Sequence, residues 1–290
     1  MSRRDRVTVV VMTRDRWPDL RASLPRHRAP VVLVDNGSAD GTPDLVAEHF
    51  PHVEVVRLPE NLGAGARNVG VERARTPYVA FADDDSWWEP DALDRAADVL
   101  DAHPRLAVLA GRMLVGADDR PDPICDLMAG SPLGRAADLP GPSVLGFLAC
   151  GAVVRREAYL SAGGFDDLVF FMGEEERLAL DLSVAGWGLS YVPEVVAHHH
   201  PSPARDTAAR RTRAARNRLL TALLRRPWPV VLRVLGETLR LGRPGLRAVL
   251  ETAVRLPRAL ARRRVLPPDV ERARRLLEAA RVVRRGAPVG

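Results

Sequence analysis

Short apolar runs that alternate with helical segments are the feature of this sequence that most limits its fold. Val7–Met12, Val31–Val34, Val53–Leu58 and Tyr78–Ala82 are rich in β-branched and other apolar residues and too short for helices. Such runs are typical of strands buried on both faces of a parallel sheet. They recur about every 20–30 residues, with helical segments between them. The first hundred residues are therefore predicted to form an α/β fold with a mainly parallel sheet flanked by helices.

Polar clusters follow three of these predicted strands. They are Thr13–Asp15, Asp35 with Asn36, and Asp83–Asp85. Ligands of open α/β sheets bind at the carboxyl ends of the strands. The sequence therefore predicts a functional site at this edge of the sheet.

The aspartate run is the sharpest of the three clusters. On an extended segment the first and third residues point the same way, so Asp83 and Asp85 are expected to share a face. Paired carboxylates suit a hard divalent cation, which in the case of Mg²⁺ is held by one or two carboxylates and substrate phosphates. The alternative is a solvated acidic turn before the helix expected near Pro90.

A glycine-rich segment, Gly63–Gly70, opens the third predicted helix. Helix N-termini favour phosphate groups through their free N–H groups. The segment lacks the Gly-Lys-Ser/Thr of a phosphate loop and the third glycine of a dinucleotide fingerprint. By itself it is equally a structural turn, and Arg67 within it either lies on the surface or turns inward toward the aspartates.

The second hundred residues are less regular. Leu106–Arg112 and Val144–Arg155 are interpreted as strands, and 121–142 as a long loop rich in proline and glycine. Glu174–Glu176 opens a helix that ends at Gly186. This half still continues the α/β pattern.

Taken in order, these motifs resemble those of the family 2 glycosyltransferases of the GT-A fold. The resemblance covers roughly residues 6–203 and is carried by Val7–Arg16, Asp35–Thr42, Asn61–Gly70, Tyr78–Pro90, Gly164–Asp166, Gly173–Glu175 and Tyr191–His198. It implies a catalytic domain over 1–204, with a nucleotide-sugar half of about 1–100 and an acceptor half of about 101–204. The implied reaction moves a sugar, with inversion, from a nucleotide-diphosphate donor to an acceptor hydroxyl, with the help of Mn²⁺ or Mg²⁺.

The resemblance also implies roles for the donor side. Thr13 and Arg14 would line the nucleotide pocket, and Asp35 would accept a hydrogen bond from the pyrimidine ring. Arg67 would support the nucleotide or the acidic motif.

For the metal, the resemblance implies that Asp85 binds the ion and that Asp83 holds the ribose or a metal-bound water. The position of His198 lies near the diphosphate in the family, so His198 is a further candidate ligand. On an extended chain only His198 and His200 of the run 198–200 could share an ion, and the alternative is a hydrogen-bonded histidine run.

The family pattern places Glu-Asp at the start of the acceptor-side helix, with the aspartate as general base. Here the run is Glu174–Glu176, so the resemblance selects Glu175 as the base and Glu174 as the residue that steadies the acceptor or the helix, and Glu176 is expected in solvent. Glu174 remains an alternative base, and all three glutamates also favour the positive end of a helix dipole.

Charge divides the chain in two. Residues 205–290 hold 23 of the 43 basic residues, all arginine, and 6 of the 37 acidic ones, a net charge of +17 against −11 for residues 1–204. Apolar residues recur there at helical spacing, which predicts an amphipathic helical region. Three interpretations stay open: packing on the catalytic domain, binding to an anionic membrane surface, or binding to nucleic acid, for which no motif is present.

The remaining features favour a cytoplasmic enzyme, peripheral to a membrane if the helical region binds lipid. The N-terminal apolar run is too short for a secretory signal, the stretch Val144–Val154 is too short to span a bilayer, and two cysteines cannot form a disulfide framework. The predicted partners are a nucleotide sugar and a saccharide or lipid-linked acceptor of a surface glycan, and not nucleic acid. The alternatives are a non-catalytic sugar-nucleotide-binding scaffold and a nucleotidyltransferase of related fold.

Overall fold

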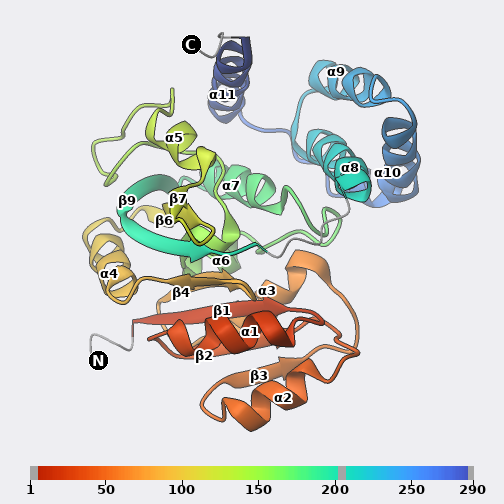
Figure 1. The fold of residues 1–290 in the computed structure, drawn as a ribbon. Coiled ribbons are helices and arrows are strands. Elements are labelled where there is room, and N and C mark those ends of the chain that lie inside the picture. The colour runs from red at the N-terminus through yellow and green to blue at the C-terminus, as the bar shows by residue number, and fades with distance from the viewer. Residues whose placement is uncertain (1–5, 202–206, 287–290) are drawn as a thin grey trace.

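One nine-stranded sheet runs through the centre of the molecule (Figure 1). The structure, a computed structural model, describes residues 6–201 and 207–286. The strands are β1 (Val7–Thr13), β2 (Val31–Asp35), β3 (Glu54–Arg57), β4 (Tyr78–Asp83), β5 (Ser86–Trp88), β6 (Leu106–Val115), β7 (Arg120–Pro121), β8 (Ala152–Arg155) and β9 (Gly188–His199). Their order in the sheet is β3-β2-β1-β4-β8-β6-β9-β5, and β7 pairs with β6.

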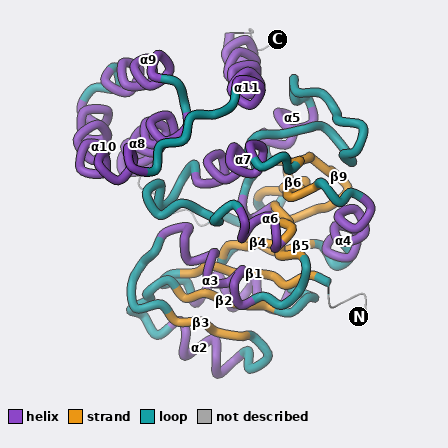
Figure 2. Tube along the Cα trace, turned by 180° about the vertical axis from the view of Figure 1, so that it is seen from behind, coloured by secondary structure: helices purple, strands orange, loops and turns teal. Residues whose placement is uncertain are grey.

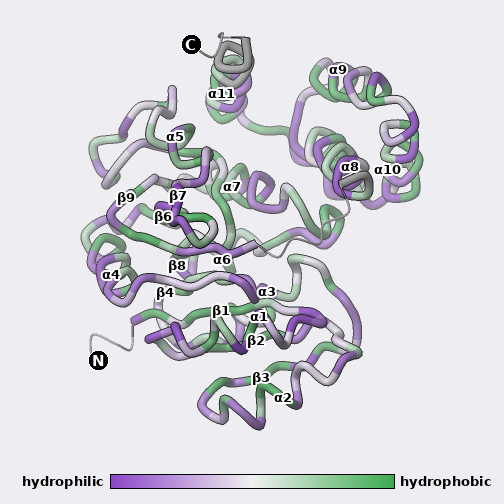
Figure 3. Tube along the Cα trace, viewed as in Figure 1, coloured by the Kyte–Doolittle hydropathy of each residue, from purple (hydrophilic) through white to green (hydrophobic). Residues whose placement is uncertain are grey.

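The first half of the sheet is the predicted parallel one. β1 pairs with β2 and β4, and β2 pairs with β3, all in parallel. Val9, Val10 and Val11 of β1 are fully buried, as expected for a strand covered on both faces, and Figure 3 shows hydrophobic residues along this strand. The second half is mixed, because β8 runs antiparallel to β4 and β6 whereas β6 and β9 are parallel. The predicted α/β fold is confirmed.

Seven α-helices and three short 3-10 turns belong to the described residues up to 201. The helices are α1 (Trp17–Ser23), α2 (Thr42–His49), α3 (Ala66–Arg73), α4 (Ala92–Ala102), α5 (Pro123–Ala129), α6 (Arg156–Ser161) and α7 (Glu174–Val184), and the turns are η2 (Leu24–Arg26), η3 (Gly63–Gly65) and η4 (Ala149–Gly151). Helix α3 packs close to the sheet, since a Cβ on Gly70 would lie 2.4 Å from Cγ1 of Val10. This close approach holds the glycine-rich segment against β1.

Two predictions for the second half were wrong in detail. The predicted loop 121–142 contains α5, whose first turn is capped by Asp122: its Oδ1 accepts a hydrogen bond of 2.8 Å from the Ile124 N–H. Of the predicted strand 144–155, only Ala152–Arg155 is a strand. Of the residues before it, 144–147 lie beside α5 and the start of α7, and Ala149–Gly151 forms the turn η4.

Four more helices follow, α8 (Thr207–Arg225), α9 (Trp228–Leu239), α10 (Arg243–Ala261) and α11 (Pro268–Gly286). Helices α8, α9 and α10 form one group, whereas α11 lies apart from them, near α5 and α7 (Figures 1 and 2). The predicted helical region is thus present. The predicted boundary between residues 204 and 205 lies outside the described residues.

The helical group packs on the α/β part of the chain. Leu220 and Leu224 of α8 are buried with Leu168 and Val169. The side-chain amide of Asn217 donates hydrogen bonds to two backbone carbonyls, 2.6 Å to Phe171 and 2.7 Å to Met172. Packing on the catalytic domain, the first of the three interpretations, therefore accounts for the inner face of these helices.

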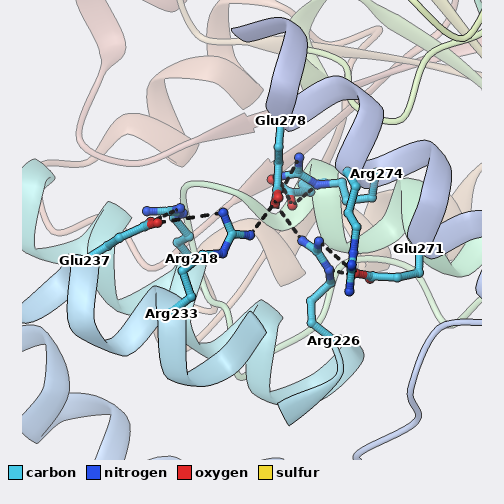
Figure 4. Close-up of polar contacts among 9 residues, drawn as sticks. Arg218, Arg226, Arg233, Glu237, Glu271, Arg274 and Glu278 are labelled. Atoms are coloured by element: carbon cyan, nitrogen blue, oxygen red, sulfur yellow. Dashed lines mark hydrogen bonds and ion pairs between the residues drawn. The ribbon is translucent and has the colours of Figure 1, made fainter. Parts of the chain in front are cut away.

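An ion-pair network fixes α11 to α8 and α9 (Figure 4). Arg226, the residue after α8, donates to Glu271 over 2.6 Å and to Glu278 over 2.8 Å. Arg233 of α9 reaches the other carboxylate oxygen of Glu278 over 2.8 Å. Burial alone would raise the pKa of Glu278, but the hydrogen bonds from Arg226 and Arg233 lower it to about 2.

The outer face of α10 carries an apolar stripe of Leu246, Leu250 and Val254, and Val254 is 82% exposed. Leu239, at the end of α9, and Leu241, just after it, are exposed as well, and Arg243 and Arg247 are exposed beside the stripe. Figure 3 shows hydrophobic residues along both helices. No helix among the described residues is long and apolar enough to cross a membrane.

We expect Glu278→Gln to lower the free energy of unfolding at pH 7 by about 1–2 kcal/mol, because it removes the charge that both arginines bind. A carboxylate with a lowered pKa stabilises the fold above its ordinary pKa of 4.5, and this contribution is lost as the pH falls toward 2. The difference between wild type and variant in urea unfolding should shrink over that interval. Glu237→Gln is the control, since its partners Arg218 and Arg233 are half exposed. An equal effect of both substitutions would contradict this account.

Candidate active site

A cleft of about 680 Å³ opens at the carboxyl ends of β1 and β4. Its walls include Asp83, Asp85, Glu174 and Glu175. A second cavity of about 220 Å³, lined by Thr13 and Arg14, adjoins it. The two cavities share the wall residues Met12, Asp84, Phe171 and Arg213. The predicted edge of the sheet therefore carries one continuous site.

Two aspartates and a histidine meet in the cleft. Asp83 ends β4, Asp85 lies in the turn to β5, and His199 ends β9. One ligand atom of each lies within 4.8 Å of the others, and His199 Nε2 is 3.2 Å from Asp85 Oδ1. Carboxylate and imidazole ligands in this arrangement fit a divalent cation. Asp83 and Asp85 share a face, as the alternation predicted.

The predicted ligand His198 is not part of this cluster, which corrects the prediction. Its Nδ1 lies 2.8 Å from Asp119 Oδ1, and its ring stacks on Trp87 with a centroid distance of 5.3 Å. The run 198–200 is extended next to β5, so successive side chains alternate. That the histidine side chains alternate was recognised from the sequence, but the face of His198 was chosen. The structure shows that His199 lies on the face that meets the aspartates.

Asp84 turns away from its two neighbours. The Thr13 hydroxyl donates a hydrogen bond of 3.3 Å to its Oδ2, and the Ser23 hydroxyl donates one of 2.7 Å to its backbone carbonyl. Burial and the charges of Asp83 and Asp85 raise the pKa of Asp84 to about 8. A protonated Asp84 at neutral pH limits the negative charge of the aspartate run.

Arg67 turns inward and is 2% exposed. Its guanidinium hydrogen-bonds Asp83 and lies 4.0 Å from Glu174 Oε1. Burial acts against its charge, but Asp83, Glu174 and Glu175 outweigh burial and raise the pKa of Arg67. Of the two alternatives for this residue, the inward one is therefore correct.

The three glutamates at the start of α7 have three different environments. Glu174 is buried, and burial together with Glu175 raises its pKa to about 8. Glu175 is half-buried, and burial raises its pKa as well. Glu176 was predicted to lie in solvent, but it forms an ion pair instead: its Oε1 lies 2.7 Å from Arg274 of α11. Of the three, only Glu174 and Glu175 line the cleft.

Asp35 lies behind the smaller cavity rather than in its lining. Its Oδ2 accepts a hydrogen bond of 3.2 Å from the Ser38 N–H, and its buried Oδ1 has no hydrogen-bond partner. The neighbouring Asn36 does line the cavity. The Asn36 amide donates to the Gly63 carbonyl over 3.0 Å and its oxygen accepts from the Leu62 N–H over 2.7 Å. Asn36 thus fixes the glycine-rich segment beside the end of β2.

Several wall residues were not predicted from the sequence. Arg210 and Arg213 reach the cleft from α8, and Phe171 and Met172 reach it from the segment before α7. The sequence shows only a general excess of arginine after residue 205, and this excess does not single out Arg210 and Arg213 as residues of the cleft. Cys150 also lines the cleft and is buried, and burial raises the pKa of its thiol.

Comparisons with known sequences agree with this geometry. The family described as glycosyl transferase family 2 matches residues 8–161. N-acetylglucosaminyl-diphospho-decaprenol L-rhamnosyltransferase of Mycobacterium tuberculosis is 30% identical in an alignment of 246 positions that covers 71% of this chain and 80% of that protein. Pre-mycofactocin glycosyltransferase of the same organism is 34% identical in an alignment of 224 positions that covers 72% of this chain and 46% of that protein.

Solved structures share the fold. The mannosyltransferase PcManGT of Pyrobaculum calidifontis, solved with GDP-Man and Mn²⁺, superposes with a TM-score of 0.58 at 24% identity, over 96% of this chain and 75% of that one. TarS of S. aureus with UDP-GlcNAc superposes with a TM-score of 0.60 at 18% identity, over 96% and 87%. At these identities the likeness shows the fold alone.

Proposed function

This chain belongs to the family 2 glycosyltransferases, and we propose that it moves a sugar, with inversion, from a nucleotide-diphosphate donor to a hydroxyl of a saccharide or lipid-linked acceptor. The observation that carries this proposal is the single cleft in which Asp83, Asp85 and His199 face Glu174 and Glu175. A site for a cation and a carboxylate that can take the acceptor's proton are the two parts that such a transfer needs.

The donor side of the proposal is supported by the smaller cavity. Thr13 and Arg14 line it and would contact the nucleotide. The buried Asp35 lies outside this lining and is not among the proposed contacts. Arg213 borders both cavities, where its charge suits a diphosphate that passes between them. Arg67 would act through Asp83, which it holds in place.

Asp83, Asp85 and His199 would hold Mn²⁺ or Mg²⁺. A carboxylate pair suits either ion, and the imidazole favours Mn²⁺. When bound, the cation would neutralise charge on the departing diphosphate.

Glu175 is proposed as the general base. In one displacement the acceptor oxygen bonds to the anomeric carbon, the bond to the diphosphate breaks, and a carboxylate takes the hydroxyl proton. Glu174 faces Arg67 and is nearly fully buried, so it is the weaker candidate and would position Arg67. Glu175 is more exposed than Glu174 and lines both the cleft and a neighbouring cavity.

The acceptor class is proposed from the relatives. The name of the rhamnosyltransferase states that its acceptor sugar is linked to decaprenol through a diphosphate. We therefore place this chain in the synthesis of a surface glycan, on the cytoplasmic side of the membrane. Incubation with a panel of nucleotide sugars and acceptors separates the alternatives: a glycosyltransferase releases nucleoside diphosphate, a nucleotidyltransferase releases pyrophosphate, and a scaffold releases neither.

Contact with an anionic membrane is proposed for the stripe on α10. Leu246, Leu250 and Val254 are exposed along one face, with Arg243 and Arg247 beside them. An apolar stripe bordered by arginine fits the headgroup boundary of anionic lipid.

The metal site leads to a paired test. Asp85→Asn and His199→Gln are each expected to weaken Mn²⁺ binding at least about tenfold, because each removes a ligand, whereas His198→Gln should leave binding unchanged. The free ion can be counted by electron paramagnetic resonance during a Mn²⁺ titration. Loss of binding in His198→Gln and not in His199→Gln would overturn the corrected ligand set.

For the base, Glu175→Gln is expected to lower kcat at least about 100-fold while donor binding persists. Burial raises the pKa of Glu175 above the ordinary 4.5. As the pH is lowered through that pKa, Glu175 becomes protonated, and the kcat of the wild type should fall. Glu48→Gln, at an exposed position of α2, is the matched control. If Glu174→Gln is the inactive variant and Glu175→Gln is active, the base is assigned to the wrong residue.

For the membrane, the double variant Leu250→Asp and Val254→Asp should bind anionic vesicles at least about tenfold more weakly than wild type. Val184→Asp, at an exposed apolar position of α7, is the control. Wild-type binding should also weaken as salt rises. Equal co-sedimentation of the wild type and the double variant with anionic vesicles would contradict the proposal. Equal co-sedimentation of the wild type with neutral and with anionic vesicles would contradict it as well.

A further inference from the structure

A separate apolar groove of about 160 Å³ lies between α5, the segment 144–147, the start of α7 and α11. Its walls are mainly aliphatic or aromatic and include Leu127, Met128, Leu145, Phe147 and Leu277. The groove uses residues from both the catalytic half and the last helix of the chain.

Glu175 connects this groove to the catalytic cleft, because its side chain lines both. An acceptor whose hydroxyl reaches Glu175 must extend away from the donor. The donor side of the cleft is polar, with Asp83, Asp85 and Arg213 in its walls. The groove is the apolar cavity that begins at the proposed base.

We propose that this groove binds the alkyl or isoprenyl group of a lipid-linked acceptor while its sugar hydroxyl contacts Glu175. The inference rests on the proposed function and names the acceptor class for the same site. An apolar cavity of about 150 Å³ is known to hold a molecule the size of benzene, so the groove takes only a few carbons of the lipid rather than a whole chain.

The position of α11 is set by charge. Arg274 is buried and bridges Glu176 of α7, over 2.7 Å, to Glu278 of its own helix, over 3.5 Å. Glu278 is held by Arg226 and Arg233 in turn (Figure 4). These pairs place Leu277 and Ala280 over the groove. The C-terminal helix therefore forms part of the acceptor site.

The test measures binding of methyl, butyl, hexyl and octyl N-acetyl-β-glucosaminides to the full chain by calorimetry, below their micelle concentrations. Each buried methylene should tighten binding by about fourfold, so burial of two or three methylenes should make the hexyl compound bind about 30-fold more tightly than the methyl one. The gain should level off once the groove is full. Donor affinity is measured on the same protein.

Two variants target the groove. Leu277→Asn makes its wall polar, and Gly146→Leu fills it from the opposite side, where an added Cβ would meet no atom within 4 Å. Each should cut the hexyl-over-methyl gain at least about tenfold. Leu276→Asn changes the adjacent residue of α11, which is 47% exposed and outside the groove, and should leave the gain intact.

The proposal is overturned if affinity does not increase with alkyl chain length in the wild type. It is also overturned if the same increase persists in both groove variants. A failure of the proposed function looks different, because no nucleotide sugar would then bind or release nucleoside diphosphate even if the alkyl series behaved as expected. Preserved donor affinity in the two variants separates loss of the groove from loss of the fold.

Discussion

The buried guanidinium of Arg67 is the interaction on which the rest of the site depends. It comes from α3 and faces Asp83 at the end of β4 and Glu174 at the start of α7. Removing one member of a buried ionic group leaves the others uncompensated, at a cost of about 3–5 kcal/mol. Arg67 therefore ties the proposed metal ligand Asp83 to the start of α7, next to the proposed base Glu175.

A second level of charge pairing joins the catalytic half to the helices that follow it. The acidic body and the basic C-terminal region meet in specific pairs: Arg225 with Asp181 over 2.7 Å, Arg258 with Asp167 over 2.6 Å, and Arg274 with Glu176 over 2.7 Å. The opposite net charges of the two parts thus reflect how they dock. Arginines that pair with carboxylates here contribute less to any membrane contact than the exposed ones near α10.

The sequence was informative where one local pattern determines the outcome. Buried valine runs identified β1 and β2, and polar strand ends located the site, because parallel strands leave their carboxyl ends at one edge. The choice between His198 and His199 depended on the register of β9 against β5, which no local pattern gives. Helix α5 was missed because proline and glycine around it indicated a loop. The contributions of Arg213 and Leu277 depend on how distant helices dock, and no spacing within the chain encodes that.

The strained segment before α7 has a consequence for how such proteins diversify. Phe170 and Met172 have positive φ angles of 69° and 76°, a conformation that costs non-glycine residues about 1–3 kcal/mol each. Asn217 of α8 binds the carbonyls of Phe171 and Met172 and so helps to hold this segment next to the glutamates. The C-terminal helices are therefore not an interchangeable attachment. A chimera that takes these helices from another enzyme has to supply an equivalent amide at this point, or the carboxylates at the start of α7 lose their alignment.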